Sequence, residues 1–216
     1  MNKNEAQGDN NMRLELELEN YTNQVKRWPN EGRHIMAQYT KDYVIAYQAF
    51  MPAIAEYAVQ HQRFGGSHYN LNRTSWIKTN FMWMMFRSGW ATKPNQERIL
   101  AIYIKADGFT EILRNAYTVQ KEKEMGVKRE DVQVRLQWDP DHDPTGEKMP
   151  RRAMQLGLKP KILTKFNDNW ILGIRDITDM VREQQSFVEQ KQLCDLMVPK
   201  ETVYLPSDEL LCEQVL

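Results

Sequence analysis

The sequence predicts a single α+β domain built on one curved, mainly antiparallel mixed sheet flanked by helices. Three observations predict this fold class. The chain has 216 residues, a length at which one domain with a sizeable core is the norm. The expected strands and helices are mixed without the regular alternation of a parallel α/β sheet. No internal repeat and no linker divides the chain.

The N-terminal half begins with a polar segment and continues with elements of both kinds. Residues 1–12 lack apolar periodicity, so we expect a disordered tail. Between Arg13 and Trp28 two patterns fit the sequence: a strand-like alternation and apolar residues at helical spacing. The helical pattern is the longer one, so we expect a helix, which Pro29 ends. β-branched and aromatic runs predict the strands that follow, and Pro52 opens a helix. The expected elements are strands at 34–38, 42–50 and 74–78 and helices at 52–62 and 80–88, the second apolar on every face and therefore buried.

The C-terminal half follows the same mixed pattern. We expect strands at 98–105, 131–138, 153–158 and 170–175 and helices at 109–117 and 178–196. Residues 139–150, rich in Pro, Gly and acids, are expected as a loop. The predicted domain spans residues 13–198, and residues 199–216 are expected as a C-terminal tail.

Charge and composition exclude several classes of protein. The 29 basic and 29 acidic side chains give zero net charge, which argues against a polybasic nucleic-acid binder but not against a local patch. No window of ~18 apolar residues and no hydrophobic leader occur, so we expect no membrane contact. Together with only two cysteines, Cys194 and Cys212, this predicts a cytoplasmic protein with reduced thiols.

Most motifs that carry catalysis or bind metals are absent from the sequence. It has no Gly-rich Rossmann or P-loop turn, no Gly-x-Ser-x-Gly elbow and no paired Cys or His spacing for zinc. Residues 139–150 begin like a calcium loop, with acids at the first, third and fifth positions. Pro144 and Pro150 stand where that loop needs Gly and Glu, so this is not a calcium loop. A solvated acidic turn explains these residues, with a weak metal or catalytic carboxylate site as the alternative, and we expect no structural metal in the protein.

A short motif at residues 105–108 keeps one enzyme class open. Lys-Ala-Asp-Gly matches the Lys-x-Asp-Gly motif with which covalent nucleotidyltransferases attack ATP, and Lys159 and Lys161 resemble their later lysine pair. A strand end followed by Asp107 as a helix N-cap explains the same residues. A lysine nucleotidyltransferase or ligase is therefore a second alternative function.

One stretch carries a charge asymmetry that the neutral total hides. From Tyr57 to Gln96 there is no Asp or Glu, but there are five cationic and eight aromatic side chains. Cations interleaved with aromatic rings suit phosphate contacts and base stacking, in RNA or in a nucleotide such as ATP or NAD. An aromatic core with a rim of arginines explains the same pattern.

Two cations of this stretch need partners if they are buried. Lys78 and Arg87 stand in its most apolar part, where an unpaired charge costs several kcal/mol. We expect their counter-ion to be a carboxylate, with Asp139 and Glu97 as candidates, or an anionic ligand.

Several blocks of the sequence resemble a known family. They are residues 32–39, 44–58, 73–91 (RTSWIKTNFMWMMFRSGWA), 134–140 and 154–157. Together they resemble the domain-of-unknown-function family 4291 of bacteria and lower eukaryotes, over roughly residues 21–206. The resemblance implies no established reaction, so a function has to be argued from the residues.

The order of the expected elements is also similar to the first half of ADP-ribosyltransferase-type folds. That similarity implies NAD in a cleft between two curved sheets, a basic or His residue on the first strand, and aromatics over the nicotinamide. It also implies a late carboxylate that orients ribose, which here would be Asp139 or Glu147. The comparison is an analogy between folds.

We therefore predict a cleft that binds a nucleotide-containing ligand, in an NAD- or nucleotide-dependent transferase. Its phosphates would pair with Arg73, Lys78 and Arg87, and its rings would stack on Trp76 and Trp138. His34 or Asp139 would transfer a proton or orient ribose. Four further residues are expected to line the cleft: Arg33, Tyr47, Gln48 and Gln155. The alternative is a non-catalytic module that binds RNA or another single-stranded nucleic acid through the same surface; NAD or ATP would be the cofactor, and the oligomeric state is left open.

Overall fold

The computed structural model describes residues 13–206 and 208–216, so the tail expected at 1–12 lies outside the described residues. The strands are β1 (Leu18–Asn20), β2 (Gly32–Arg33), β3 (Ile35–Ala37), β4 (Tyr43–Phe50), β5 (Ser75–Lys78), β6 (Arg98–Lys105), β7 (Ala116–Tyr117), β8 (Val134–His142), β9 (Lys148–Leu158), β10 (Ile171–Asp176), β11 (Met197–Pro199) and β12 (Thr202–Tyr204). The helices are α1 (Tyr21–Val25), α2 (Pro52–His61), α3 (Phe81–Ser88), α4 (Ala106–Arg114), α5 (Val119–Glu124), α6 (Pro160–Lys165), α7 (Thr178–Glu189) and α8 (Glu209–Val215), and a π-helical turn, η1 (Phe166–Trp170), follows α6.

An eight-stranded sheet forms the centre of the fold. Its order is β10-β6-β4-β5-β9-β8-β7, and β2 pairs with β9 beside this path. The β2–β9 and β7–β8 pairs are parallel and the others in this sheet are antiparallel. Two small sheets, β1–β11 and β3–β12, join the two ends of the described chain. The fold class is thus the predicted one: a mixed α+β domain on a mainly antiparallel sheet.

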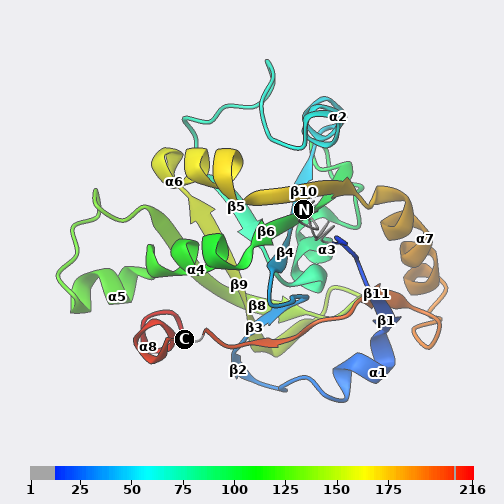
Figure 1. Ribbon diagram of the computed structural model, residues 1–216. Helices are drawn as coiled ribbons and strands as arrows, with labels where there is room; N and C mark the ends of the chain where they lie inside the picture. The colour runs from blue at the N-terminus through cyan, green and yellow to red at the C-terminus, as the bar shows by residue number, and fades with distance from the viewer. Residues whose placement is uncertain (1–12, 207) are drawn as a thin grey trace, which may run out of the picture.

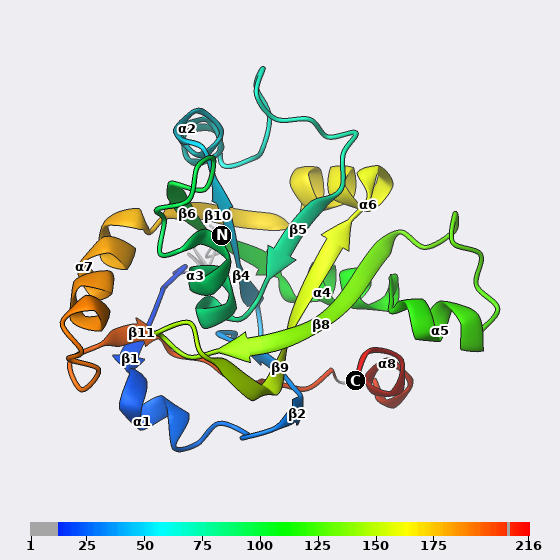
Figure 2. The ribbon, with the colours of Figure 1, turned by 180° about the vertical axis from the view of Figure 1, so that it is seen from behind.

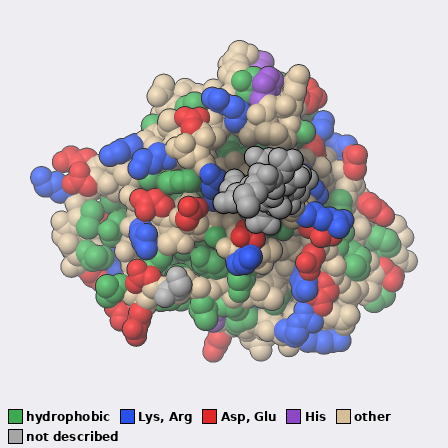
Figure 3. Space-filling model, in the orientation of Figure 1, with side chains coloured by type: hydrophobic (Ala, Val, Ile, Leu, Met, Phe, Trp, Pro, Cys, Tyr) green, Lys and Arg blue, Asp and Glu red, His purple; other side chains and the backbone are tan. Residues whose placement is uncertain are grey.

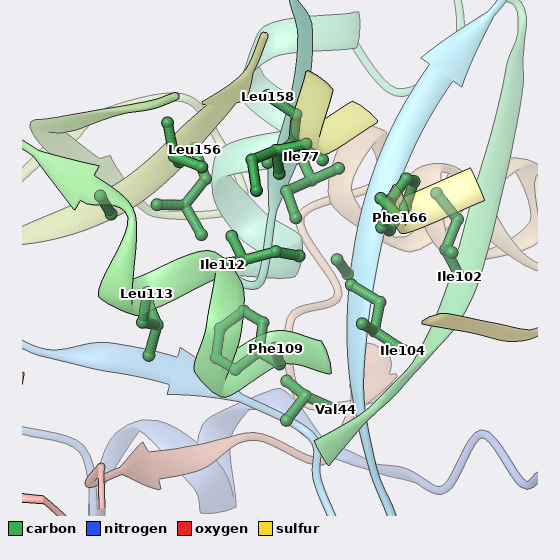
Figure 4. Close-up of a cluster of buried hydrophobic side chains, with 14 of the residues drawn as sticks. Val44, Ile77, Ile102, Ile104, Phe109, Ile112, Leu113, Leu156, Leu158 and Phe166 are labelled. Carbon is green, nitrogen blue, oxygen red and sulfur yellow. The ribbon is translucent and has the colours of Figure 1, made fainter. Parts of the chain in front are cut away.

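Helices cover both faces of this sheet (Figures 1 and 2). On one face, Phe109, Ile112 and Leu113 of α4 pack over Ile77 and other strand residues (Figure 4). On the other face, α3 and α7 lie over β4 and β6 in a second apolar cluster. The predicted burial of α3 is confirmed for the five residues from Phe81 to Met85.

The expected helix at 13–28 is wrong except for the short α1. Residues 13–17 are not helical, and β1 pairs with β11 near the other end of the chain. Leu14 and Leu16 pack against the second cluster, and Glu17 exchanges backbone hydrogen bonds with the Gln38 side chain, at 3.1 and 2.8 Å. Tertiary contacts have therefore selected the alternating pattern over the helical one.

Four other expected segments differ from the observed ones. The loop expected at 139–150 shortens to residues 143–147, because β8 and β9 form a long hairpin. Here the Asp143 carboxylate accepts hydrogen bonds from the Thr145 and Glu147 amides, which closes a tight turn. The helix expected at 109–117 is α4, which starts and ends three residues earlier, and α7 ends at Glu189. Residues beyond 198, expected as a tail, contribute β12 and α8, and Leu211 and Val215 are buried in the first cluster.

The charged side chains on the surface are mixed in sign. In Figure 3, basic and acidic groups are interspersed over the face shown. In the part of the chain that the structure describes, no helix is long and apolar enough to cross a membrane.

Gly108 provides a test of the close packing between α4 and η1. A Cβ at this position would lie 2.4 Å from Cγ of Trp170. Alanine is the better helix former by about 1 kcal/mol, but overpacking a core costs about 1–3 kcal/mol. We expect Gly108→Ala to lower the free energy of unfolding, measured by urea denaturation. An unchanged or raised stability would show that α4 and η1 separate easily.

Candidate functional site

The candidate site is a cavity at the point where β4 and β5 part. These strands pair at one position, Tyr47 with Lys78. Beyond it, toward Phe50 and Thr74, a cavity of about 390 Å³ opens, which we call the β4–β5 cleft. Its lining residues come from β4, the β5 strand and its N-terminal approach, α3, the 89–97 loop and β9: Gln48, Ala49, Phe50, Thr74, Ser75, Trp76, Lys78, Met84, Arg87, Gln96 and Gln155.

Strand alternation places Trp76 and Lys78 on one face of the sheet. Trp76 and Lys78 are two residues apart on β5, so they point to the same side of the sheet. Their partners on β9 are Gly157 and Gln155. The residue between them, Ile77, points into the opposite apolar cluster (Figure 4). Trp76 and Lys78 thus lie on the α3 face, whereas Gln48 and Ser75 alternate toward the other face, so the cleft opens between the two strands.

Helix α3 brings a second cation to the cleft. Its N-terminus is fixed twice: the Asn80 side chain accepts from the Trp83 amide at 2.6 Å, and the buried Glu201 carboxylate accepts from the Phe81 amide at 2.7 Å. The helix ends at Gly89, which takes the left-handed conformation (φ 58°). Arg87, in the last turn, lines the cleft from there.

Lys78 is the most unusual side chain of the cleft. The residue is only 5% exposed, and its ammonium group makes no ion pair and no hydrogen bond with the described residues. Burial, the largest cause, and the neighbouring Arg87 together lower the pKa of its ammonium group to about 8, whereas Asp139 opposes the shift. The Asp139 carboxylate instead accepts from Nε2 of Gln155 at 2.7 Å.

Arg87 is exposed, so Lys78 alone of these two cations is buried. Arg87 lies at the rim because the last turn of α3 leaves the apolar cluster at Phe86. Within the described residues, neither Asp139 nor Glu97 forms an ion pair with Arg87 or Lys78. Glu97 accepts from the Asn95 amide at 2.8 Å. The two cations of the cleft therefore lack the carboxylate partners that the sequence suggested.

Gln48 lines the cleft and is held in place by two hydrogen bonds. The residue is 3% exposed, and its Nε2 donates to Ser75 Oγ at 2.8 Å and to the Trp76 carbonyl at 2.9 Å. A carbonyl only accepts, so this contact fixes the amide with nitrogen toward Trp76. Tyr69 donates its hydroxyl to the same Ser75 Oγ at 3.1 Å, and burial raises the pKa of Tyr69 to about 12. Oε1 of Gln48 is left buried without a partner.

Trp76 forms an aromatic wall of the cleft because a glycine faces it. A Cβ on Gly157 would lie 2.9 Å from the indole ring, so only glycine at this position lets the ring lie on β9. Trp76 is half-buried and lines the cavity.

The structure brings together about half of the residues that the sequence suggested. Five of them line the β4–β5 cleft: Gln48, Trp76, Lys78, Arg87 and Gln155. Asp139 adjoins it through its hydrogen bond with Gln155. Sequence reasoning missed Ser75 and Tyr69, whose hydroxyls orient Gln48 and whose spacing forms no motif.

Five suggested residues do not line this cleft. Tyr47 is buried against Phe81, with ring centroids 5.5 Å apart, and burial raises the pKa of its phenol. Trp138 points to the opposite face of the sheet from Asp139 and donates to the Val215 carbonyl at 3.0 Å. The other three lie elsewhere on the surface: Arg33 beside the Leu216 carbonyl, His34 beside the Glu31 carbonyl, and Arg73 exposed in the loop before β5.

The Lys-Ala-Asp-Gly motif also lies apart from the cleft. Lys105 is exposed and pairs with Tyr43, at the end of β4 opposite to the cleft. The expected N-cap at Asp107 is shifted, because α4 already begins at Ala106. The Asp107 carboxylate accepts only the adjacent Gly108 amide, at 2.7 Å.

A buried histidine closes the hairpin on α3. His142 is 3% exposed, its ring stacks on Phe86 with centroids 3.4 Å apart, and Trp83 lies parallel at 5.4 Å. Neither ring nitrogen has a partner among the described residues. Burial lowers the pKa of His142, with a smaller contribution from Lys148 that Asp141 and Asp143 oppose.

Acid is expected to destabilise the protein through this histidine. The pKa of His142 is lower in the folded than in the unfolded chain, so below about pH 6.5 the unfolded state binds more protons. The stability that the neutral, buried ring contributes is therefore complete above that pH and is lost as the pH falls. We expect the melting temperature of the wild type to fall more steeply from neutral to mildly acidic pH than that of His142→Phe. Equal slopes would show that His142 is not responsible.

A comparison with known protein families matches the part of the chain that holds the cleft. A family model described as Domain of unknown function (DUF4291) matches residues 34–204, which contain the β4–β5 cleft. No curated protein matches the chain. The match covers most of the chain and agrees with the resemblance of its sequence blocks, so this chain belongs to the DUF4291 family.

Proposed function

We propose that the β4–β5 cleft binds a nucleoside phosphate and that the protein is a nucleotide-utilising transferase. The observation that carries the proposal is the pair of cations, Lys78 and Arg87, that face one cavity of small-molecule size without a carboxylate partner among the described residues.

Charge is the first support for the proposal. A buried ammonium group without a counter-ion is costly, and the protein retains one here beside a guanidinium. A phosphate between them would compensate both charges, and Arg87 can bind two phosphate oxygens at once. The pKa of Lys78 would then rise toward its ordinary value.

Shape and hydrogen bonding are the second support. A volume of about 390 Å³ is within the usual range for small-molecule sites and suits a mononucleotide. Trp76 offers an aromatic surface on which a base can stack. Asp139, held by Gln155 beside the cleft, is the carboxylate available for proton transfer or ribose orientation.

A melting experiment with three ligands tests this function. We expect ATP or NAD to raise the melting temperature, with about 2.7 kcal/mol of added stability when the ligand is at a hundred times its Kd. Arg87→Ala should weaken the effect, whereas Arg73→Ala, which removes an exposed arginine outside the cleft, should not.

RNA is the third ligand in this experiment. If an oligonucleotide stabilises the protein, with an affinity that falls steeply as salt is raised, and nucleotides do not, the protein is instead a nucleic-acid-binding module. Stabilisation by none of the three ligands contradicts both functions.

A further inference from the structure

We propose that Lys78 is a nucleophile that accepts a nucleotidyl group from a nucleoside triphosphate, so that the protein forms a covalent lysine–nucleotide intermediate. This inference rests on the proposed function, because it needs a nucleotide in the β4–β5 cleft. It moves the covalent chemistry from the lysine of the Lys-Ala-Asp-Gly motif to a lysine inside the cavity.

The two lysines lie at opposite ends of the sheet. Lys78 lies in the wall of a cavity that can hold a mononucleotide. Lys105, despite its motif, is exposed at the other end of the sheet and lines none of the cleft. Of the two, only Lys78 can reach a phosphate bound beside Arg87.

The two cations of the cleft can take different roles. A guanidinium stays charged at every physiological pH and binds phosphate oxygens, so Arg87 can hold the terminal phosphates. Lys78 is desolvated, lies next to that cation and has no carboxylate partner, which are the conditions that make a lysine amine nucleophilic. A carboxylate partner would stabilise the charged form of a lysine that serves only as a cation. The nearby Asp139 carboxylate is hydrogen-bonded to Gln155 instead.

The backbone that carries the Lys78 amine is fixed by the sheet. Lys78 is paired on both sides, with Tyr47 of β4 and with Gln155 of β9. Gln48 is locked by Ser75 and the Trp76 carbonyl, which fixes the strand end beside the cleft. A nucleotide held by Trp76 and Arg87 would therefore have its α-phosphate near the lysine, because that phosphate lies between the base and sugar and the terminal phosphates.

The reaction balances without any redox partner. The lone pair of the neutral Lys78 amine forms the P–N bond to the α-phosphorus of the triphosphate. The P–O bond to the β-phosphate breaks, and its electron pair leaves with pyrophosphate. The proton of the amine passes to water. The product is a lysine phosphoramidate that can pass the nucleotidyl group to an acceptor.

The test uses the full chain with magnesium and ATP labelled at the α-phosphate or at the γ-phosphate. We expect label on the protein only from the α-position, on the peptide that contains Lys78, through a bond that acid breaks. The rate should rise with pH through about 8 as the amine loses its proton. Lys78→Arg, which keeps the charge, should lower labelling by about tenfold or more, and Lys105→Arg should not.

Several results would overturn the inference. They are label that persists in Lys78→Arg or maps to another residue, label that comes from the γ-phosphate, and no label from α-labelled ATP, GTP, CTP or UTP although one of them raises the melting temperature. The melting temperature also separates the two proposals, since a protein that no nucleotide stabilises fails the proposed function first. If Lys78→Arg does not fold, the peptide map of the labelled wild type decides.

Discussion

Replacement of Asp141 by Ala is expected to lower the free energy of unfolding by about 3–5 kcal/mol, since it leaves a buried charge unpaired. Asp141 is fully buried and Arg151 is 2% exposed, and Nε of Arg151 donates to Oδ2 of Asp141 at 2.8 Å. The same guanidinium donates to the Pro29 carbonyl at 2.8 Å and lies over the Trp28 ring. The ion pair therefore ties the β8–β9 hairpin to the N-terminal segment.

Urea denaturation of matched variants measures this effect. Glu19→Ala removes a surface ion pair with Arg27 and is expected to cost only about 0–1 kcal/mol. A double variant, Asp141→Leu with Arg151→Met, should recover much of the loss, because both charges then leave the core. A cost for Asp141→Ala no larger than that for Glu19→Ala would contradict the burial of this pair.

Replacement of Lys78 by Met is expected to raise the free energy of unfolding by about 1–3 kcal/mol at neutral pH. Methionine fills a similar volume and removes a buried, unpaired ammonium group. The pKa of Lys78 falls from 10.5 to about 8 on folding, so the charge is destabilising below pH 8 and has no effect above about 10.5. The advantage of Met should therefore shrink as the pH rises through this window.

A loss of stability in Lys78→Met would contradict this interpretation and would make Lys78 a structural residue. Gln155→Leu serves as a control at the paired position on β9, because it removes a neutral polar group from the same cleft. Only the lysine variant should show the pH-dependent gain, which melting curves at several pH values measure.

Sequence patterns within single helices and strands predict much of this fold. The β-branched run of β6 was predicted to the residue, and Pro52 and Gly89 mark the start of α2 and the end of α3. The helix expected at 13–28 failed because two periodicities fit the same residues and a distant strand, β11, decided between them. The expected C-terminal tail forms β12 and α8, since its pairing with β3 spans most of the chain and leaves no local signal.

The sequence predicts the candidate site best where the burial of a charge has a free-energy cost. Lys78 was singled out as a cation in an apolar stretch, and it is buried in the cleft without a carboxylate. Residue type alone groups Trp138 and Tyr47 with it. Trp138 lies on the opposite face of the sheet, because neighbouring residues on a strand face opposite sides. Tyr47 pairs with Lys78 but is buried against Phe81 of α3. Ser75 and Tyr69 were missed, since their value lies in a contact that only the folded chain creates.

The effect of a nucleotide on the melting temperatures of the wild type and of Lys78→Met, measured side by side at neutral pH, tests the proposed nucleotide site most directly. A nucleoside phosphate should raise the melting temperature of the wild type and leave that of the more stable variant unchanged, because the variant has lost the buried cation of the cleft. Equal shifts in the two proteins, or no shift in either with ATP or NAD, would contradict a nucleotide site in the β4–β5 cleft.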